Sequence, residues 1–114
     1  MPKQLNRSKG TEAEQSAAAY LERNGYSIVE RNARTRFGEI DIIAAKDNVL
    51  VFVEVKAKGS SLFGLPEEMI TAKKKKKLNL LTRAYIADKK FRGQARIDVI
   101  AMDHQGLRHY ENAF

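Results

Sequence analysis

Two neighbouring stretches of the chain carry the hydrophobic pattern of buried β-strands. Residues 39–45 and 49–55 are rich in Ile and Val, and Asp47-Asn48 between them is a turn signal. The pattern predicts a β-hairpin whose strands lie in the middle of a sheet. Four charged residues nevertheless interrupt or end these apolar strands: Glu39, Asp41, Glu54 and Lys56. The hairpin is therefore the first candidate for a functional site.

The period of two along a strand predicts how these charged residues meet. A turn at residues 47–48 sets Asp41 opposite Glu54 and Glu39 opposite Lys56. Facing residues have Cβ atoms about 4.5–5.5 Å apart, and like charges at that distance are destabilising. Two facing carboxylates therefore need a cation, and Mg²⁺ accepts one or two carboxylates together with waters and phosphate oxygens. In the alternative, Glu39 and Lys56 form an exposed ion pair while Asp41 and Glu54 face solvent.

The rest of the pattern predicts two helices and three more strands. We expect helices at residues 11–24 and 67–88, and strands at 26–32, 95–102 and 107–110. Thr11 and Glu14 fit the capping box that begins a helix, and Gly25 fits the residue that ends one. In chain order the elements are αβββαβ, followed by a short final strand. This order predicts an α/β protein with a mixed central sheet flanked by two helices.

Each predicted helix turns one charged residue toward its apolar side. On a helical wheel Glu14 falls about 20° from Leu21, so it either caps the helix or adds a third carboxylate to the site. Lys74 lies between Ile70 and Leu78 in the apolar stripe of the second helix. Its amine either extends to solvent along its stem or points at an acidic group, for which the hairpin carboxylates and a bound phosphate are candidates.

The segments around these elements are polar. We expect residues 1–10 to be a flexible basic tail and residues 11–114 to form a single domain. Arg34 and Arg36 precede the hairpin, where they either hold phosphate oxygens bidentately or form a solvated edge. Residues 57–66 form a loop rich in Gly, Ser and Pro, which is either a lid or a plain connection.

The net charge narrows the choice of partner. The chain has 114 residues and a formal charge of +7. Such a basic chain favours an anionic partner, with nucleic acid the commonest choice and an anionic membrane surface the alternative. No apolar run approaches the ~20 residues of a membrane span, and no signal segment is evident. The absence of Cys excludes disulfides and suits a reducing cytoplasm, where we expect the protein.

The charged hairpin predicts metal-dependent phosphodiester hydrolysis. Asp41 and Glu54 would hold Mg²⁺ or Mn²⁺, which would bind a phosphate oxygen and lower the pKa of its water. Lys56 would orient that water or help to deprotonate it, and would stabilise the developing charge. Asp98 either approaches the site or, as we expect for an edge strand, faces water, and His109 is expected to lie on the surface. The alternatives are a nucleic-acid-binding protein that keeps the site without cutting efficiently on its own, and an interaction module that only binds an ion.

Several widely separated motifs also resemble those of one family. They are AEQSAAAYL with Gly25-Tyr26, GEIDIIA, FVEVKAK, Phe63-Gly64 followed by Pro66, Lys74 four residues before Leu78, ARIDVIA and the final NAF. In this order they resemble the YraN family of small bacterial proteins over about residues 10–114. Members of that family are predicted nucleases with the restriction-endonuclease-like PD-(D/E)xK fold of Holliday-junction resolvases.

The resemblance implies a restriction-endonuclease-like core and a DNA substrate, either duplex or branched. It implies that Asp41, Glu54 and Lys56 form the nuclease core and that Glu14 is the helix carboxylate often added to resolvase sites. Lys74 likewise matches a lysine of the family.

Four basic residues are the candidates for contacting DNA: Arg34, Arg36, Lys58 and Lys74. Lys58 stands where the family usually has Arg, which weakens a bidentate phosphate contact there. Cutting both strands of a duplex or a symmetric junction needs two sites related by a two-fold axis, so we also expect a homodimer.

Overall fold

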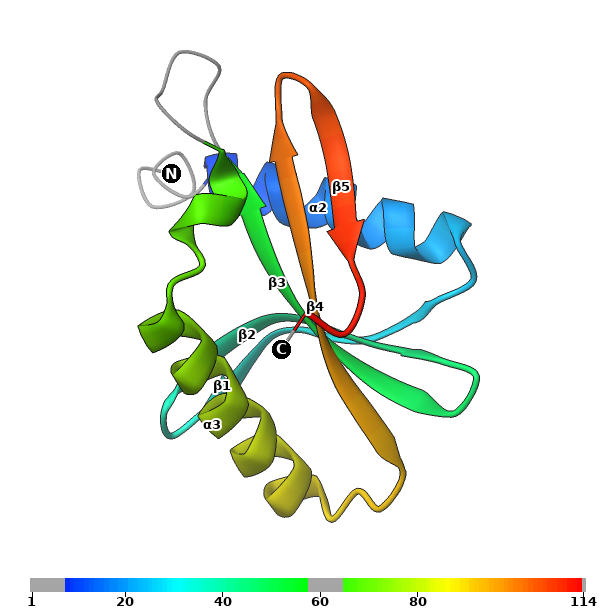
Figure 1. The fold of residues 1–114 in the computed structure, drawn as a ribbon. Helices are drawn as coiled ribbons and strands as arrows, with labels where there is room; N and C mark the ends of the chain where they lie inside the picture. The colour runs from blue at the N-terminus through cyan, green and yellow to red at the C-terminus, as the bar shows by residue number, and fades with distance from the viewer. Residues whose placement is uncertain (1–7, 58–64, 114) are drawn as a thin grey trace.

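The computed structural model describes residues 8–57 and 65–113 (Figure 1). Their elements, in chain order, are α2 (Ser8–Arg23), β1 (Ser27–Thr35), β2 (Gly38–Lys46), β3 (Val49–Ala57), the 3₁₀ turn η1 (Pro66–Met69), α3 (Ala72–Lys89), β4 (Gln94–Asp103) and β5 (Gly106–Tyr110). The predicted α/β class, with its mixed sheet and two helices, is confirmed. The arrangement is consistent with a restriction-endonuclease-like core.

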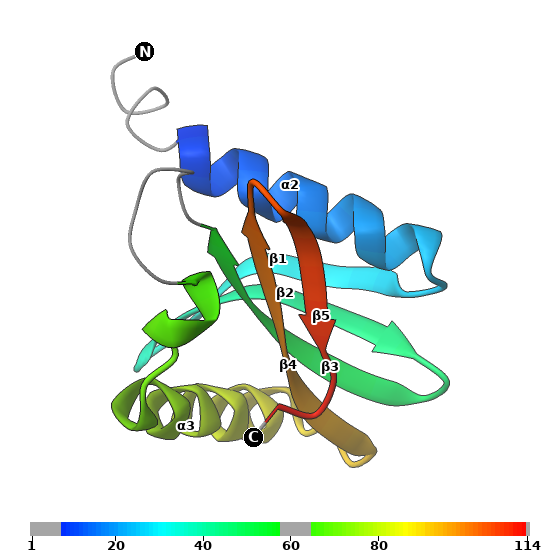
Figure 2. The same ribbon diagram turned by 45° about the horizontal axis from the view of Figure 1, so that its top comes forward.

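One five-stranded sheet forms the centre of the molecule, with the strands in the order β1-β2-β3-β4-β5. All neighbouring strands are antiparallel except β3 and β4, which run parallel. A parallel pair needs a crossover connection, and here the chain crosses through η1 and α3. Helix α2 lies across one face of the sheet and α3 lies on the opposite face (Figure 2).

The hydrophobic core is divided by the sheet into two parts. On the α2 side, the buried residues are Ala17, Ala18, Leu21, Tyr26, Ile42, Ala44, Val51, Val53 and Ile100. On the α3 side, they are Ala33, Ile40, Ile43, Leu50, Phe52, Leu78, Leu81, Tyr85 and Ile97. Neighbouring residues of the hairpin, such as Val51 and Phe52, therefore belong to opposite parts, as the period of two requires. Both faces of the central hairpin are covered, which confirms that its strands are internal.

Helix α2 ends as predicted but begins earlier. Gly25 has a φ of 90°, and the N–H of Tyr26 donates to the carbonyl of Leu21 at 3.0 Å, which is the main bond of a Schellman motif. The helix starts at Ser8, so Thr11 has a helical backbone. An N-cap residue is non-helical, and the predicted capping box is therefore wrong. Of the predicted tail, residues 8–10 belong to the helix and residues 1–7 lie outside the described residues.

The second helix is interrupted where the sequence predicts a continuous one. The turn η1 ends at Met69 and α3 begins at Ala72. Between them Thr71 is extended, and its side-chain oxygen accepts a hydrogen bond from the backbone N–H of Lys74 at 3.2 Å. A threonine in this position satisfies one of the free N–H groups of a helix start, which explains why the helix begins here and not at Glu67.

Candidate active site

The central hairpin has the predicted turn and register. Its paired residues run from Lys46 opposite Val49 to Ile42 opposite Val53. Residues 47–48 both have positive φ angles, 52° and 66°. A two-residue turn of type I′ requires positive φ at both positions, and Asp and Asn tolerate it well. Local turn chemistry therefore sets which side chains meet further along the hairpin.

One step beyond the last paired residues, β3 separates from β2. We call this place, defined by Asp41 and Glu54, the branch point. Here the backbone N–H of Val55 donates to Oδ2 of Asp41 at 2.8 Å, so a side chain takes the place of a backbone carbonyl. On the other side of β2, the register with β1 skips Asp41 and its counterpart Asn32, whose φ is 52°. Asp41 thus lies where β2 is irregular toward both of its neighbours.

The branch point brings Asp41 and Glu54 together. Burial raises the pKa of Asp41 to about 7, the negative charge of Glu54 adds to the rise, and the N–H of Val55 partly opposes it. Glu54 is only 5% exposed. The structure therefore places two carboxylates side by side in poor contact with water, where both can be ionised only if a cation accompanies them.

Two lysines approach Glu54. The amine of Lys74 lies 3.1 Å from Oε2 of Glu54, and the amine of Lys56 lies 3.7 Å from the same oxygen. Lys56 comes from the same strand, whereas Lys74 comes from the first turn of α3 and crosses to the sheet. Of the two alternatives for Lys74, the structure favours the one in which its amine points at a hairpin carboxylate.

Glu14 lies beside this pair and is held by β1. Its Oε1 accepts a hydrogen bond from Nδ2 of Asn32 at 2.9 Å, and Nη2 of Arg31 is 3.9 Å from the same oxygen. Its charge contributes to the raised pKa of Asp41, after burial and Glu54. Within residues 8–57 and 65–113, however, no three acidic or histidine side chains converge as a metal-binding group. Glu14 is a neighbour of the carboxylate pair in this structure.

The predicted pairing of Glu39 with Lys56 is wrong. Glu39 pairs across to β1, where its Oε2 lies 3.4 Å from Nη2 of Arg34. Lys56 lies opposite Ala101 of β4. The reason is the branch point itself, since β3 stays paired with β4 along its whole length but is no longer paired with β2 by the time it reaches Lys56. The alternative of an exposed ion pair between these two residues fails for the same reason.

The other candidates for DNA contact do not converge on the carboxylates. The side chain of Arg34 is 85% exposed and pairs with Glu39. Arg36 lies at the turn between β1 and β2, with its guanidinium 5.0 Å from the ring centroid of Phe37. The structure places both on the solvated edge that was one of their two predicted alternatives. Lys58 lies outside the described residues, as does most of the loop at 57–66.

A second polar cluster, on the α2 side of the sheet, was not predicted. Asp98 is 0% exposed, because β5 covers the far side of β4 and leaves it internal. Nε of Arg96 donates to Oδ1 of Asp98 at 2.9 Å, and Nε2 of His109 lies 2.7 Å from Oδ2. The predictions that Asp98 faces water and that His109 lies on the surface are therefore wrong.

The charge of Asp98 is fully matched by its neighbours. Burial alone would raise the pKa of Asp98, but hydrogen bonds from His109, Arg96 and the N–H of Asn112 outweigh it and hold that pKa below its ordinary value. An ionised carboxylate only accepts, so Nε2 of His109 donates to it, and Nδ1 of the same ring is hydrogen-bonded to the hydroxyl of Tyr20 at 3.0 Å. The cluster ties α2 to the C-terminal strand.

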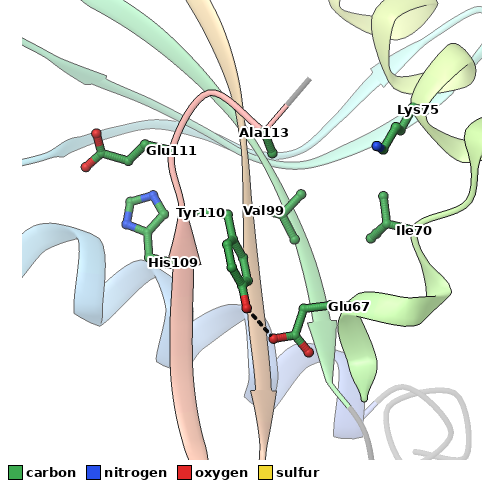
Figure 3. Close-up of a pocket in the computed structure, with 8 residues that line it drawn as sticks. All are labelled: Glu67, Ile70, Lys75, Val99, His109, Tyr110, Glu111 and Ala113. Carbon is green, nitrogen blue, oxygen red and sulfur yellow. Dashed lines mark hydrogen bonds between the residues drawn. The ribbon is translucent and has the colours of Figure 1, made fainter. Parts of the chain in front are cut away.

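A third polar contact fixes η1 against β5. Nη2 of Arg108 donates to Oε1 of Glu67 at 3.0 Å, and the hydroxyl of Tyr110 donates to Oε2 at 2.6 Å (Figure 3). The hydrogen bonds from Arg108 are the main reason that the pKa of Glu67 falls to about 2. Nothing local in the sequence signals this contact, because its members are about forty residues apart.

The fold and the branch point define a small α/β protein with a restriction-endonuclease-like core and paired carboxylates on its central hairpin. A family model described as "Uncharacterised protein family UPF0102" matches residues 13–102. The chain belongs to this family, which is the YraN family, and the family predicted from its motifs is therefore confirmed.

The relatives of the chain extend over nearly its whole length. It is 45% identical to a UPF0102 protein of Persephonella marina over 107 residues, which cover 93% of this chain and 92% of the relative. It is 46% identical to one of Thermodesulfovibrio yellowstonii, covering 92% of this chain and 94% of the relative. With a UPF0102 protein of Thermotoga maritima the identity is 43%, over 88% and 91%. The family assignment therefore applies to the entire fold described above.

Proposed function

We propose that the protein is a metal-dependent endonuclease that hydrolyses DNA phosphodiester bonds at the branch point. The observation that carries the proposal is the convergence of Asp41, Glu54, Lys56 and Lys74, which come from three different elements. Two adjacent carboxylates suit a catalytic metal ion, and two amines beside them suit the negative charge of a phosphate. A protein that only binds nucleic acid has no need to bury carboxylates that repel each other.

The carboxylate pair fits a hard divalent cation. Carboxylate oxygens are the ligands that Mg²⁺ and Mn²⁺ prefer, and Mg²⁺ is commonly held by one or two of them. The raised pKa of Asp41 reflects burial and the charge of Glu54. A cation bound between the two carboxylates would stabilise their ionised forms and so oppose both effects. Asp41 and Glu54 would hold the ion, which when bound supplies a Lewis acid for a phosphate oxygen and a water of lowered pKa.

The residues of the chain provide the rest of the site. The N–H of Val55 fixes the orientation of the Asp41 carboxylate. The amine of Lys56 is placed to orient the attacking water and to stabilise negative charge as it develops on the phosphate. Lys74 holds Glu54 in the absence of DNA and is available to a phosphate when one arrives. Glu14, fixed by Asn32, adds negative charge on the opposite side of Asp41.

The charge of the chain supports a nucleic-acid partner. The formal charge is +7, and none of the described helices is long and apolar enough to cross a membrane. Five consecutive lysines, residues 73–77, begin α3 next to the branch point. A homodimer would place two such sites on opposite strands of a duplex or junction, and forms part of the proposal.

A cleavage assay tests the proposed activity. Labelled four-way junction, flap, single-stranded and linear duplex DNA are incubated with the protein in Mg²⁺, in Mn²⁺ and in chelator. We expect cutting only with metal, and its loss in Glu54→Gln and in Lys56→Ala. The matched control is Glu39→Gln. This change also removes a carboxylate from the hairpin, but that carboxylate pairs with Arg34 of β1, on the side away from β3.

The outcome also separates the two predicted functions. Cutting that survives in Glu54→Gln would contradict the proposed site. A wild-type protein that binds DNA with strong salt dependence, yet cuts none of the four substrates with either metal, would favour the alternative of a binding protein that does not cleave on its own.

A further inference from the structure

A groove lies next to the branch point on the α3 side of the sheet. Its volume is about 610 Å³. Its walls include Glu67, Ile70, Lys75, Val99, Tyr110 and Ala113 (Figure 3). Figure 3 shows Tyr110 and Val99 on one side, from β5 and β4, and Ile70 and Lys75 across from them. The groove is thus formed between the edge of the sheet and the start of the η1–α3 crossover.

The groove begins one strand away from the proposed cleavage site, whose own residues do not line it. Glu54 of β3 is paired with Val99 of β4, and Val99 is paired with Tyr110 of β5. Paired residues on neighbouring strands point to the same face, and the strands are about 4.8 Å apart. Val99 therefore lies one strand from Glu54, and Tyr110 lies two strands from it. A polymer held at the carboxylates would extend into the groove within one monomer unit.

The walls of the groove suit a flat, partly apolar group. Val99, Ile70 and Ala113 provide an apolar surface. Tyr110 is 42% exposed, although its hydroxyl is held by Glu67, which is itself held by Arg108. The ring is therefore fixed before any ligand binds, so stacking on it costs little conformational entropy.

The charges along α3 lead from the site to the groove. Lys74 points at Glu54, and the next residue, Lys75, lines the groove. These two successive lysines suit two successive phosphates of a DNA strand: Lys74 for the one at the cleavage site and Lys75 for the one beside the groove. Lys75 and the exposed ring of Tyr110 combine positive charge with an aromatic surface, as in proteins that bind single-stranded nucleic acid, while the charge of Glu67 in the same groove is balanced by Arg108.

We propose that this groove binds an unpaired nucleobase of the DNA strand held at Asp41 and Glu54. The proposal rests on the proposed nuclease function and adds a substrate class to it. In a continuous duplex, both faces of every base are covered by its neighbours, so Tyr110 has nothing to stack on. The protein therefore prefers DNA with unpaired nucleotides beside the scissile phosphate, such as a single strand, a flap or the open centre of a junction.

The test compares a single strand with a blunt duplex of the same sequence. Binding is measured by fluorescence anisotropy in chelator, so that no strand is cut. We expect Tyr110→Ala to weaken single-strand binding by ~5- to 100-fold and to leave duplex binding within about twofold, since stacking on an aromatic ring contributes at this level. Tyr110→Phe keeps the ring but loses the hydrogen bond to Glu67 that fixes it, so single-strand binding should fall far less than in Tyr110→Ala.

A second variant keeps the test valid if the loss of Tyr110 disturbs β5. Ala113→Phe fills the groove from another wall and leaves Tyr110 in place, and we expect it to weaken single-strand binding by a similar factor. Equal effects of Tyr110→Ala on both DNAs, no effect on either, or no measurable DNA binding by the wild type would overturn the proposal. A different result would contradict only the nuclease function: the wild type cuts no DNA, yet it still prefers the single strand and Tyr110→Ala still loses that preference.

Discussion

Asp41 and Asp98 are aspartates on internal strands of one sheet, yet their surroundings give them opposite properties. Burial, the charge of Glu54 and, to a lesser extent, that of Glu14 raise the pKa of Asp41 to about 7. Asp98 is the more deeply buried of the two, but hydrogen bonds from its neighbours keep its pKa below the ordinary value. The difference lies in what each carboxylate meets, since Asp98 meets Arg96 and a histidine whereas Asp41 meets other carboxylates.

The comparison shows that burial alone does not identify a functional carboxylate. A buried charge with a complete set of donors is a structural element, because its charge is already balanced. A buried charge beside another of the same sign still has binding energy to gain from a cation, and such groups occur at functional sites. By this criterion Asp41 belongs to a site and Asp98 belongs to the framework.

The largest expected effect comes from removing Asp98. Asp98→Ala leaves Arg96 and His109 without their shared partner, and removing one member of a buried ion pair typically costs about 3–5 kcal/mol of stability. We expect this loss in the free energy of unfolding, measured by denaturant titration at pH 7. The control is Asp88→Ala, at an exposed position of α3, which should stay close to the wild type. A loss below about 1 kcal/mol would place Asp98 in the same class as a surface aspartate.

The next effect is a pH dependence that belongs to Asp41. The pKa of this carboxyl rises from 3.8 to about 7 on folding, so between these values the native state binds more protons than the unfolded state. Stability therefore falls as the pH rises through this window and then stays constant, with a total contribution of at most about 4 kcal/mol. In metal-free buffer, the wild type should lose stability relative to Asp41→Asn from pH 4 to pH 7.

Two controls strengthen this measurement. Glu39→Gln should follow the wild-type curve, since its carboxylate is exposed and pairs with Arg34. Adding Mg²⁺ at pH 8 should restore stability to the wild type and not to Asp41→Asn, because a ligand that binds only the native state stabilises it. Parallel curves for the wild type and Asp41→Asn would show that Asp41 ionises as freely as an exposed group.

The smallest effect concerns the link between Asp98 and α2. Tyr20→Phe removes the hydroxyl that is hydrogen-bonded to Nδ1 of His109 and keeps the ring, so we expect a loss of about 1 kcal/mol in the free energy of unfolding. The pH dependence assigned to Asp41 should be unchanged. A loss as large as that of Asp98→Ala would instead show that the whole cluster acts as one cooperative network.

The features that the sequence predicted correctly depend on local rules. The hairpin register follows from the turn at residues 47–48, and the end of α2 follows from Gly25. The position of Lys74 in an apolar stripe was an anomaly that needed an acidic partner, and Glu54 is that partner. In each case the information lies within a few residues or in a conflict between a residue and its pattern.

The features that were missed depend on contacts between distant segments. Asp98 becomes internal only because the short strand β5 adds to the sheet, and Glu67 is fixed by residues about forty positions later. The pairing of Glu39 with Lys56 failed because counting along a hairpin assumes that its strands stay together. The early start of α2 and the break at Thr71 were missed because several residues in each region favour a helix start, and spacing alone does not rank them.

The branch point also has a practical consequence for labelling the protein. The spacing of Asp41 and Glu54 is fixed by where β3 loses β2 as a neighbour, at the end of the hairpin far from its tip. The turn at residues 47–48 sets this register, so residues inserted between Asp47 and Asn48 would shift the pairing and with it the separation of the carboxylates. A fluorophore, a purification tag or a fusion partner should therefore be attached away from this turn, so that the carboxylates keep their separation.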